Sequence, residues 1–344
     1  MKVCVLADTH FGVRQDSEAF HDNMEKFYSE IFFPEVKSRN ISHIIHVGDV
    51  FDNRKKIDMY TARRAREYFF ETLKESAITM DVTAGNHDLY FRHESNTTAL
   101  REILGLYKNI RFFTDVTDVS LAGGKPICYV PWIHNNNRDE SIERIKNSKS
   151  EIVFGHLELT GYQMYKGQIS KHGEDPALFE RFQHAYSGHF HHKNSRANIT
   201  YLGSTSQHIW SDHGDVRGFH IFDTETYDVE FVANPYHMFE ILNYDEDDST
   251  LPDVKGKYVR LLHGEIKSQS KLDKFIKQLI ESGVADLKVI PSASYSVKYN
   301  ANTNVRDDKS VNIEDALALM RSVVEEDDVY SKLEELYNKA QLCM

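Results

Sequence analysis

The chain has 344 residues, with 41 Lys and Arg against 53 Asp and Glu, so its formal net charge at pH 7 is −12. A hydrophobic content of 40% and a charged content of 27% exclude the disordered and collagen-like classes of protein. The acidic balance argues against a nucleic-acid partner, because domains that bind nucleic acid usually carry a basic excess. The 18 histidines are more than incidental surface histidines would supply.

The cysteines and the apolar runs indicate the compartment. Cys4, Cys128 and Cys343 lie far apart with no CxxC spacing, which is typical of a protein in a reducing compartment. The first residues run directly into a predicted strand, so we expect no signal peptide. No apolar run approaches the ~20 residues that a membrane helix needs. We therefore expect a cytoplasmic protein without a membrane partner.

Hydrophobic patterns predict alternating strands and helices through the first part of the chain. Strands are predicted at 3–7, 43–47, 79–83, 110–113, 127–130 and 151–154, and helices at 18–38, 58–75, 97–108 and 139–146. Beyond residue 183, the pattern changes to strands at 185–187, 199–202, 218–222 and 228–232. This order predicts an α/β fold in which two sheets pack together and are flanked by helices.

An acidic run at 245–249, followed by Pro252, predicts a domain boundary. A small β-α-β unit is predicted beyond it, with strands at 258–263, 287–290 and 295–299 and a helix at 271–282. The chain is expected to end in a polar linker and two amphipathic helices, at 313–325 and 329–340. These patterns predict a main domain at 1–240, a small domain at 241–300, a linker at 301–310 and a helical pair at 311–344.

Five short polar motifs follow predicted strands. They are Asp8-Thr9-His10-Phe11-Gly12, Gly48-Asp49-Val50-Phe51-Asp52, Gly85-Asn86-His87-Asp88, Gly155-His156 and Gly188-His189-Phe190-His191. Strand C-termini line one crevice in α/β sheets, so we expect these side chains to meet there. Carboxylates, imidazoles and an amide, with no thiol, form a ligand set suited to Mn²⁺, Mg²⁺, Fe or Zn²⁺. One such motif alone would be weak evidence, whereas five in order predict a metal-dependent catalytic site.

The five motifs resemble those of the calcineurin-like metallophosphoesterases, and within that family those of the SbcD-type DNA-repair nucleases, which work with an SMC-like ATPase. Residues 155–161, residues 201–205 and the pair Gly218-Phe219 are also similar to blocks of these nucleases. The small domain and the final helices match their capping domain and ATPase-binding helices in order only. The compact length suits the phage recombination-nuclease branch, whose members would act in the cytoplasm of a bacterial host. The resemblance implies a four-layer sandwich and DNA cleavage in recombination and double-strand-break repair.

The resemblance also implies two divalent ions, Mn²⁺ with Mg²⁺ as the alternative, bridged by Asp49. Asp8, His10 and His191 would complete the first site, and Asn86, His156 and His189 the second. Two such ions can clamp the phosphoryl oxygens during in-line attack.

The resemblance assigns catalytic roles to two further residues. His87 would protonate the leaving O3′ or stabilise the transition state. Asp52 would orient His87 through an imidazole–carboxylate hydrogen bond, with a turn-capping role as its alternative. Asp88 is expected to fix its loop, and His192 to support the site or lie on the surface.

The basic cluster Arg54, Lys55 and Lys56 is expected either to contact DNA phosphates or to be a solvated helix face. Apolar residues on more than one side of helix 58–75, together with helix 97–108, indicate a homodimer contact, with burial inside the chain as the alternative. The terminal helical pair is expected to dock on the ATPase or to fold back on the body.

Two other functions stay open for the chain as a whole. One is a small phosphodiesterase or phosphatase on the same fold, and the other is a subunit that mainly scaffolds the ATPase complex. Protein phosphatases of the family carry arginines where this chain has Asn53 and Ala84, which argues against the first.

Overall fold

The computed structural model describes residues 1–121, 126–165, 167–248, 250–292 and 295. The chain divides into two units, Met1–Ser292 and Ala293–Met344. The predicted linker at 301–310 and the helical pair at 311–344 therefore lie outside the described residues, as does the strand expected at 295–299 beyond its first residue.

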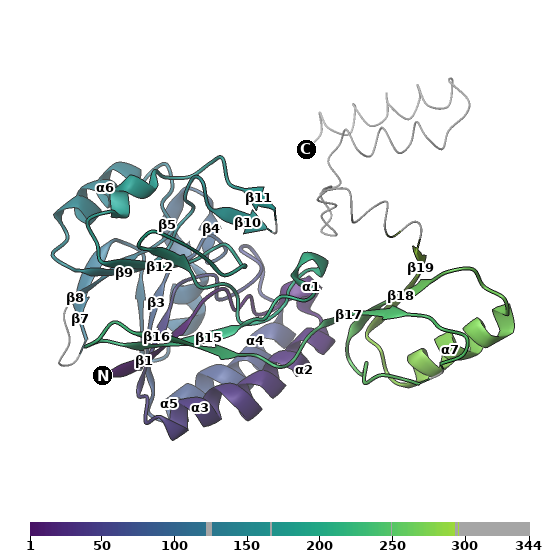
Figure 1. Cartoon of the computed structure of the whole chain (residues 1–344). Coiled ribbons are helices and arrows are strands. Elements are labelled where there is room, and N and C mark those ends of the chain that lie inside the picture. Colours follow the sequence, from purple (N-terminus) through teal and green to yellow (C-terminus); the bar gives the residue numbers. More distant parts are fainter. Residues whose placement is uncertain (122–125, 166, 249, 293–294, 296–344) are drawn as a thin grey trace, which may run out of the picture. The chain divides into compact units, whose positions relative to one another are not determined.

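The first large sheet brings together strands from both ends of the main domain (Figure 1). Its strands β1, β2, β3 and β6 are parallel, while β15 is antiparallel to β1 and β16 to β15. In sheet order they are β16 (Val229–Ala233), β15 (Gly218–Asp223), β1 (Lys2–Leu6), β2 (His43–His46), β3 (Thr79–Thr83) and β6 (Ile110–Phe113).

The second large sheet has a parallel centre with an antiparallel strand at each edge. In sheet order its strands are β13 (Asn194–Arg196), β14 (Ile199–Tyr201), β12 (His184–Gly188), β9 (Ile152–His156), β8 (Pro126–Val130) and β7 (Thr117–Ser120). The parallel strands β9 and β12 are almost wholly buried, which fits strands covered on both faces.

The two sheets pack face to face around a shared core that includes Val5, Ile45, Phe154 and Tyr186. Four helices cover the outer face of the first sheet, namely α2 (Glu18–Phe27), α3 (Phe33–Ser38), α4 (Met59–Ala65) and α5 (Glu71–Glu75), and α6 (Arg138–Asn147) packs on the second. The predicted four-layer sandwich is therefore confirmed. Its physical basis is that each sheet has one face toward the other sheet and one face toward helices.

The helices predicted at 18–38 and 58–75 both contain a π-helical turn at their middle. The first consists of α2 (Glu18–Phe27), η1 (Tyr28–Phe32) and α3 (Phe33–Ser38), and the second of α4 (Met59–Ala65), η2 (Arg66–Phe70) and α5 (Glu71–Glu75). The turns pack against each other through Tyr28 and Phe69, whose ring centroids are 4.8 Å apart. Tyr68 and Phe70 are buried in the same core. The apolar width of this helix therefore reflects burial inside the chain, which was the alternative expectation, and the homodimer stays a prediction.

The helix predicted at 97–108 is wrong at both of its ends. Residues 94–98 form strand β5 (Glu94–Thr98), which pairs with β4 (Leu89–Phe91) in a hairpin, and only a π-helical turn, η3 (Leu100–Leu104), follows. Leu104 is buried, whereas Leu106 is 87% exposed. The sequence pattern missed the hairpin because Asn96, Thr97 and Thr98 give no apolar alternation.

The small sheet after the sandwich has three parallel strands in the order β17 (Phe239–Asn243), β18 (Tyr258–His263) and β19 (Asp286–Pro291). Helix α7 (Gln269–Glu281) connects β18 to β19 and buries Leu272, Phe275 and Leu279. The predicted β-α-β unit is therefore present, with an additional strand on its N-terminal side that the sequence pattern did not indicate. Because β17 begins at Phe239, the expected division at 240/241 falls within this strand, and the domain limits stay a prediction.

The main domain also contains a small hairpin and two short 3-10 turns. The hairpin consists of β10 (Gln163–Tyr165) and β11 (Gln168–Ile169), and the turns are η4 (Pro176–Phe179) and η5 (Trp210–Asp212). Among the described residues, no helix combines the length and the apolar character needed to cross a membrane.

Candidate metal centre

The loops after five parallel strands converge on one site. Asp8, Asp49 and Asn86 follow β1, β2 and β3, while His156 ends β9 and His189 follows β12. All five motifs thus lie at strand C-termini, as the sequence predicted, because the parallel strands of both sheets end at the same edge. Asp8, His10, Asp49 and His156 are each no more than 3% exposed.

One group of ligand atoms forms around Asn86. Its Oδ1 lies 3.0 Å from His156 Nε2 and 3.0 Å from His189 Nδ1, and Asp49 Oδ2 lies 3.3 Å from His156 Nε2. These are the four residues that the resemblance assigned to the second ion. An amide oxygen, two imidazole nitrogens and a carboxylate form a donor set that fits a divalent cation.

A second group forms around His10. Its Nε2 lies 3.1 Å from His191 Nε2 and 3.5 Å from Asp49 Oδ2. Two imidazole nitrogens facing each other at this distance either share a proton or bind one cation, so the residues fit the first ion. Asp8 is adjacent, and both of its carboxylate oxygens lie within 3.1 Å of the His189 backbone N–H, which donates to them.

The His10 group also includes a residue that the sequence analysis missed. His208 offers a ring nitrogen within 4.8 Å of ligand atoms of His10 and His191. No motif surrounds His208, so the only signal in the sequence was the excess of histidines. The sequence analysis also missed Trp132, because no motif surrounds it either. Its ring packs 5.0 Å from that of His189 and limits the positions that the imidazole can take.

Asp88 ties the second and third motifs together. Its Oδ2 accepts hydrogen bonds from the backbone N–H of Asp49 at 2.9 Å and of Gly85 at 2.8 Å, and its Oδ1 accepts from Val50. The expected loop-fixing role fits this geometry. A Cβ at position 85 would lie 2.2 Å from Asp49 Oδ1, so only glycine allows the two loops to come this close.

His87 is held by Asp52, but not by the group that was expected. The imidazole Nδ1 of His87 donates to the backbone carbonyl of Asp52, and the Asp52 carboxylate instead lies 3.2 Å from His10 Nδ1. The predicted carboxylate–imidazole bond to His87 is therefore wrong. Because a carbonyl oxygen can only accept, the Nδ1 of His87 carries the proton and leaves its Nε2 available.

His192 is buried, and its Nδ1 contacts the carboxylate of Asp215. Its Nε2 lies 3.8 Å from Asp212 Oδ1, and Asp212 also binds Arg217. The residue therefore supports the loop behind His191 and does not lie on the surface.

The buried acidic and imidazole groups of the site differ in their protonation. Burial would raise the pKa of Asp49, but His156 first, then His87 and His10, hold it well below its usual range. Burial opposes charge on His156 as well, yet the adjacent Asp49 raises its pKa to about 9. Burial and the neighbouring His156 lower the pKa of His189 to about 3. The site therefore combines charged His–Asp pairs with neutral imidazoles, and a cation would have to displace the protons of the charged ones.

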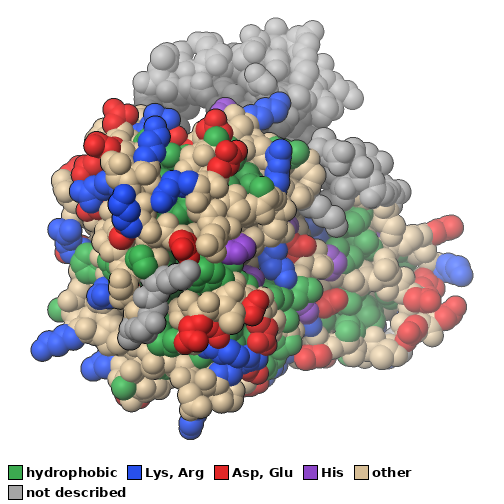
Figure 2. Space-filling view, turned by 60° about the vertical axis from the view of Figure 1, so that its left-hand side comes forward, with side chains coloured by type: hydrophobic (Ala, Val, Ile, Leu, Met, Phe, Trp, Pro, Cys, Tyr) green, Lys and Arg blue, Asp and Glu red, His purple; other side chains and the backbone are tan. Residues whose placement is uncertain are grey.

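The predicted basic cluster lies beside this centre. Lys55 and Lys56 are exposed, whereas Arg54 is half-buried. Burial and the charge of Arg92 lower the pKa of Arg54, and Asp49 opposes that shift. Two guanidinium groups that repel each other favour an anion at this position. Figure 2 shows basic and acidic side chains interspersed on the face that it draws.

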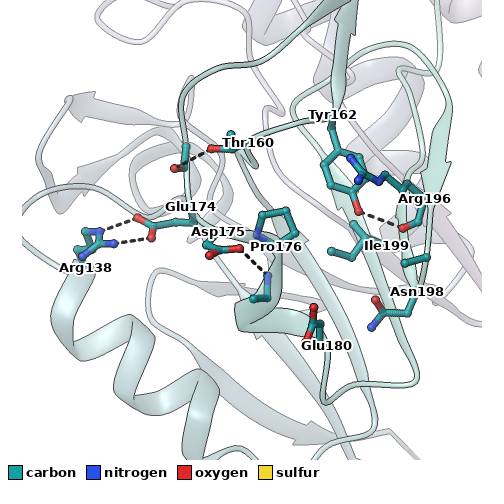
Figure 3. A pocket seen from close by; sticks show the side chains of 13 residues that line it. Arg138, Thr160, Tyr162, Glu174, Asp175, Pro176, Glu180, Arg196, Asn198 and Ile199 are labelled. Atoms are coloured by element: carbon teal, nitrogen blue, oxygen red, sulfur yellow. Dashed lines mark hydrogen bonds and ion pairs between the residues drawn. The ribbon is translucent and has the colours of Figure 1, made fainter.

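Another hollow, of about 740 Å³, lies on the second sheet's side and contains none of the candidate ligands (Figure 3). Several of its polar side chains are bonded to each other or to the backbone around the hollow. Glu174 accepts two hydrogen bonds of 2.7 Å from Arg138, and Asp175 caps η4 at Ala177. The hollow is therefore lined by residues of several elements and is separate from the candidate ligands.

Fold and site together define a class of protein. The chain matches the calcineurin-like phosphoesterase family over residues 1–193, and it belongs to that family of metal-dependent hydrolases of phosphate esters. It is 32% identical over 326 residues to exonuclease subunit 1 of Enterobacteria phage T4, which covers 94% of this chain and 92% of the relative. The family expected from the motifs is confirmed.

Two further comparisons are more distant. The DNA double-strand break repair protein Mre11 of Sulfurisphaera tokodaii is 27% identical over 196 residues, 54% of this chain and 48% of the relative. A solved archaeal phosphodiesterase shares 14% identity over 68% of this chain and 99% of its own, with a TM-score of 0.34.

Proposed function

We propose that this chain is a two-metal DNA nuclease that acts with an SMC-like ATPase in recombination and double-strand-break repair. Its activities would be 3′→5′ exonuclease on duplex DNA and endonuclease on single strands. The observation that carries the proposal is the convergence of the five motifs on one buried site. The likeness to a phage exonuclease subunit across nearly the whole chain gives it the nucleic-acid substrate.

Two divalent ions fit the donor groups described above. Asp8, His10 and His191 would hold one ion, Asn86, His156 and His189 the other, and Asp49 would contact both. Mn²⁺ suits these mixed nitrogen and oxygen donors better than Mg²⁺, which prefers oxygen. When bound, such ions neutralise charge that develops on the phosphoryl oxygens.

His87 is the proton donor in this proposal. The Asp52 carbonyl fixes its Nδ1–H tautomer, so its Nε2 serves the leaving oxygen. Burial lowers the pKa of His87, and the negative charge of Asp49 opposes that shift. The negative charge of a bound phosphate would act in the same direction as Asp49 and favour the protonated form that the role requires.

DNA would be held by its backbone. Arg54 lies within electrostatic reach of Asp49 and of Arg92, and it has no carboxylate partner in the described part of the chain. The exposed Lys55 and Lys56 follow it in the sequence. Such contacts position a phosphodiester at the ions without reading its sequence. Residues 311–344 would dock on the ATPase, and a homodimer remains a prediction without support from the helix at 58–75.

A cleavage assay with Mn²⁺ tests the proposal on end-labelled duplex and single-stranded DNA. Asp49→Ala should abolish cleavage because it removes a ligand of both ions. His87→Ala should slow cleavage by about 10²–10⁴-fold while Mn²⁺ binding is unchanged. Full activity of Asp49→Ala would refute the two-metal scheme, and hydrolysis of phosphopeptides with intact DNA would identify a phosphatase instead.

A further inference from the structure

The imidazole of His208 is buried at the candidate metal centre and has no hydrogen-bond partner in the part of the chain that the structure describes. The residue is 2% exposed, and neither Nδ1 nor Nε2 has a hydrogen-bond partner among the described residues. Buried polar groups in folded proteins are nearly always satisfied, so a side chain with two unsatisfied nitrogens indicates a ligand that binds there.

The neighbours of this ring identify the ligand. The centroid of the His208 ring lies 5.1 Å from that of His10 and 5.1 Å from that of His191, and the latter two centroids are 4.9 Å apart. The three rings meet edge to face, at interplanar angles of 65° to 89°. Each offers a nitrogen within 4.8 Å of the others, which is the spacing of ligands around a single cation.

The backbone fixes His208 in this position from both sides. Its N–H donates to the Asp212 carboxylate at 2.7 Å, and its carbonyl accepts from Arg14 Nε at 3.1 Å. Asp212 is itself fully buried and paired with Arg217. Backbone support of this kind is what holds a ligand in place before its ion arrives.

We propose that His208 is an additional nitrogen ligand of the ion held by His10 and His191. The inference rests on the metal site of the proposed function and adds a third imidazole to that ion. Three nitrogens favour Mn²⁺, Fe²⁺ or Zn²⁺ over Mg²⁺, which prefers oxygen ligands. His208 would therefore determine which cation the first site accepts.

Calorimetric titration of the full chain with Mn²⁺, without DNA, tests the assignment. His208→Leu should weaken one of two Mn²⁺ sites by at least about tenfold and leave the other unchanged. His220→Leu is the matched control, because His220 is also a buried imidazole but lies within β15. Wild-type affinity at both sites of His208→Leu would overturn the proposal, including the case in which His208 only contacts substrate phosphate.

Two measurements guard against a folding defect. In EDTA, the melting temperature of His208→Leu should equal or exceed that of the wild type, because the change removes unsatisfied polar atoms. Its rise on adding Mn²⁺ should be smaller than that of the wild type. A rise equal to that of the wild type would contradict the assignment.

The wild-type chain labelled with ¹⁵N-histidine gives a direct count. Addition of Zn²⁺ should shift the ring nitrogens of five imidazoles if His208 binds, and of four if it does not. This count needs no nucleic acid, so it is independent of the nuclease function. A chain that shows five shifted imidazoles but does not cleave DNA would refute the nuclease function and still support His208 as a ligand.

Discussion

At the scale of single residues, the candidate ligands occupy strained backbone conformations. Asp8, His10, Asp49 and His189 all have positive φ, between 44° and 85°. For residues other than glycine, such a conformation costs roughly 1–3 kcal/mol and persists only where its surroundings enforce it. The hydrogen bonds that the Asp88 carboxylate accepts from the backbone N–H groups of Asp49 and Val50 are one such constraint. The backbone conformations that direct these side chains to one point therefore lower the free energy of unfolding.

The contact between Asp52 and His10 leads to a prediction at this scale. Asp52→Ala should weaken Mn²⁺ binding by about 10–100-fold, because the carboxylate fixes the orientation and tautomer of a metal ligand. Asp52→Asn should restore most of the affinity, since its amide oxygen still accepts from His10 Nδ1. Titration with Mn²⁺ measures both variants.

Asp22→Ala is the control for Asp52, because Asp22 carries an exposed carboxylate paired with Arg64. If Asp52 acted on His87 through its carboxylate, Asp52→Ala would slow DNA cleavage at unchanged Mn²⁺ affinity. That result would contradict the contact seen here.

At the scale of elements, strand β15 links the two ends of the main domain and carries a buried histidine. His220 is 6% exposed and packs against Phe231 of β16 at 5.1 Å between ring centroids. Burial, and then the charge of Lys193, lower its pKa to about 4. The strand therefore holds an imidazole that the fold keeps neutral.

The pH dependence of stability follows from this shift. The folded pKa of about 4 lies below the unfolded value of about 6.5, so between these pH values the unfolded chain binds more protons. The contribution of His220 to the free energy of unfolding is present above pH 6.5 and is lost as the pH falls toward 4.

Denaturant unfolding in EDTA at pH 7.5 and 5.5 checks this prediction. The wild type should lose about 1.4 kcal/mol more than His220→Leu over this interval. An equal loss in both proteins would show that His220 does not titrate as inferred.

At the scale of the whole molecule, charge is unevenly distributed. Residues 306–344 contain 5 Lys and Arg and 10 Asp and Glu, so this segment carries −5 of the net −12. The Asp8, Asp49 and Asp52 carboxylates lie among histidines at the metal centre, where cations would neutralise them. The acidic composition therefore does not exclude a nucleic-acid substrate at that centre.

A truncated chain ending at residue 305 tests whether DNA cleavage and ATPase binding belong to different segments of the chain. Because Met1–Ser292 is one unit and contains every candidate ligand, the truncated chain should retain Mn²⁺-dependent DNA cleavage within about twofold. It should lose binding to a co-expressed SMC-like ATPase in a pull-down assay. Retained binding would refute the role proposed for the terminal segment.

By itself, the sequence determined most of the strands of the two large sheets and the candidate ligands that the strand-end motifs carry. The sequence could identify Asp49, Asn86 and His156 because each follows or ends a buried strand. The C-termini of parallel strands lie at one edge of a sheet, which brings these residues together. The hairpin at β4 and β5 and the strand β17 could not be found, because their short sequences lack a distinctive apolar period.

Only the tertiary structure decided which side chains meet within the site. It placed the carboxylate of Asp52 on His10, its carbonyl on His87, and His208 and Trp132 against ligands from remote segments. These contacts depend on how loops from both sheets pack against one another, and packing of that kind leaves no periodic trace in the sequence. The positions of strands along the chain follow from local patterns, whereas the order of strands in a sheet and the partner of each buried polar group follow from the assembled fold.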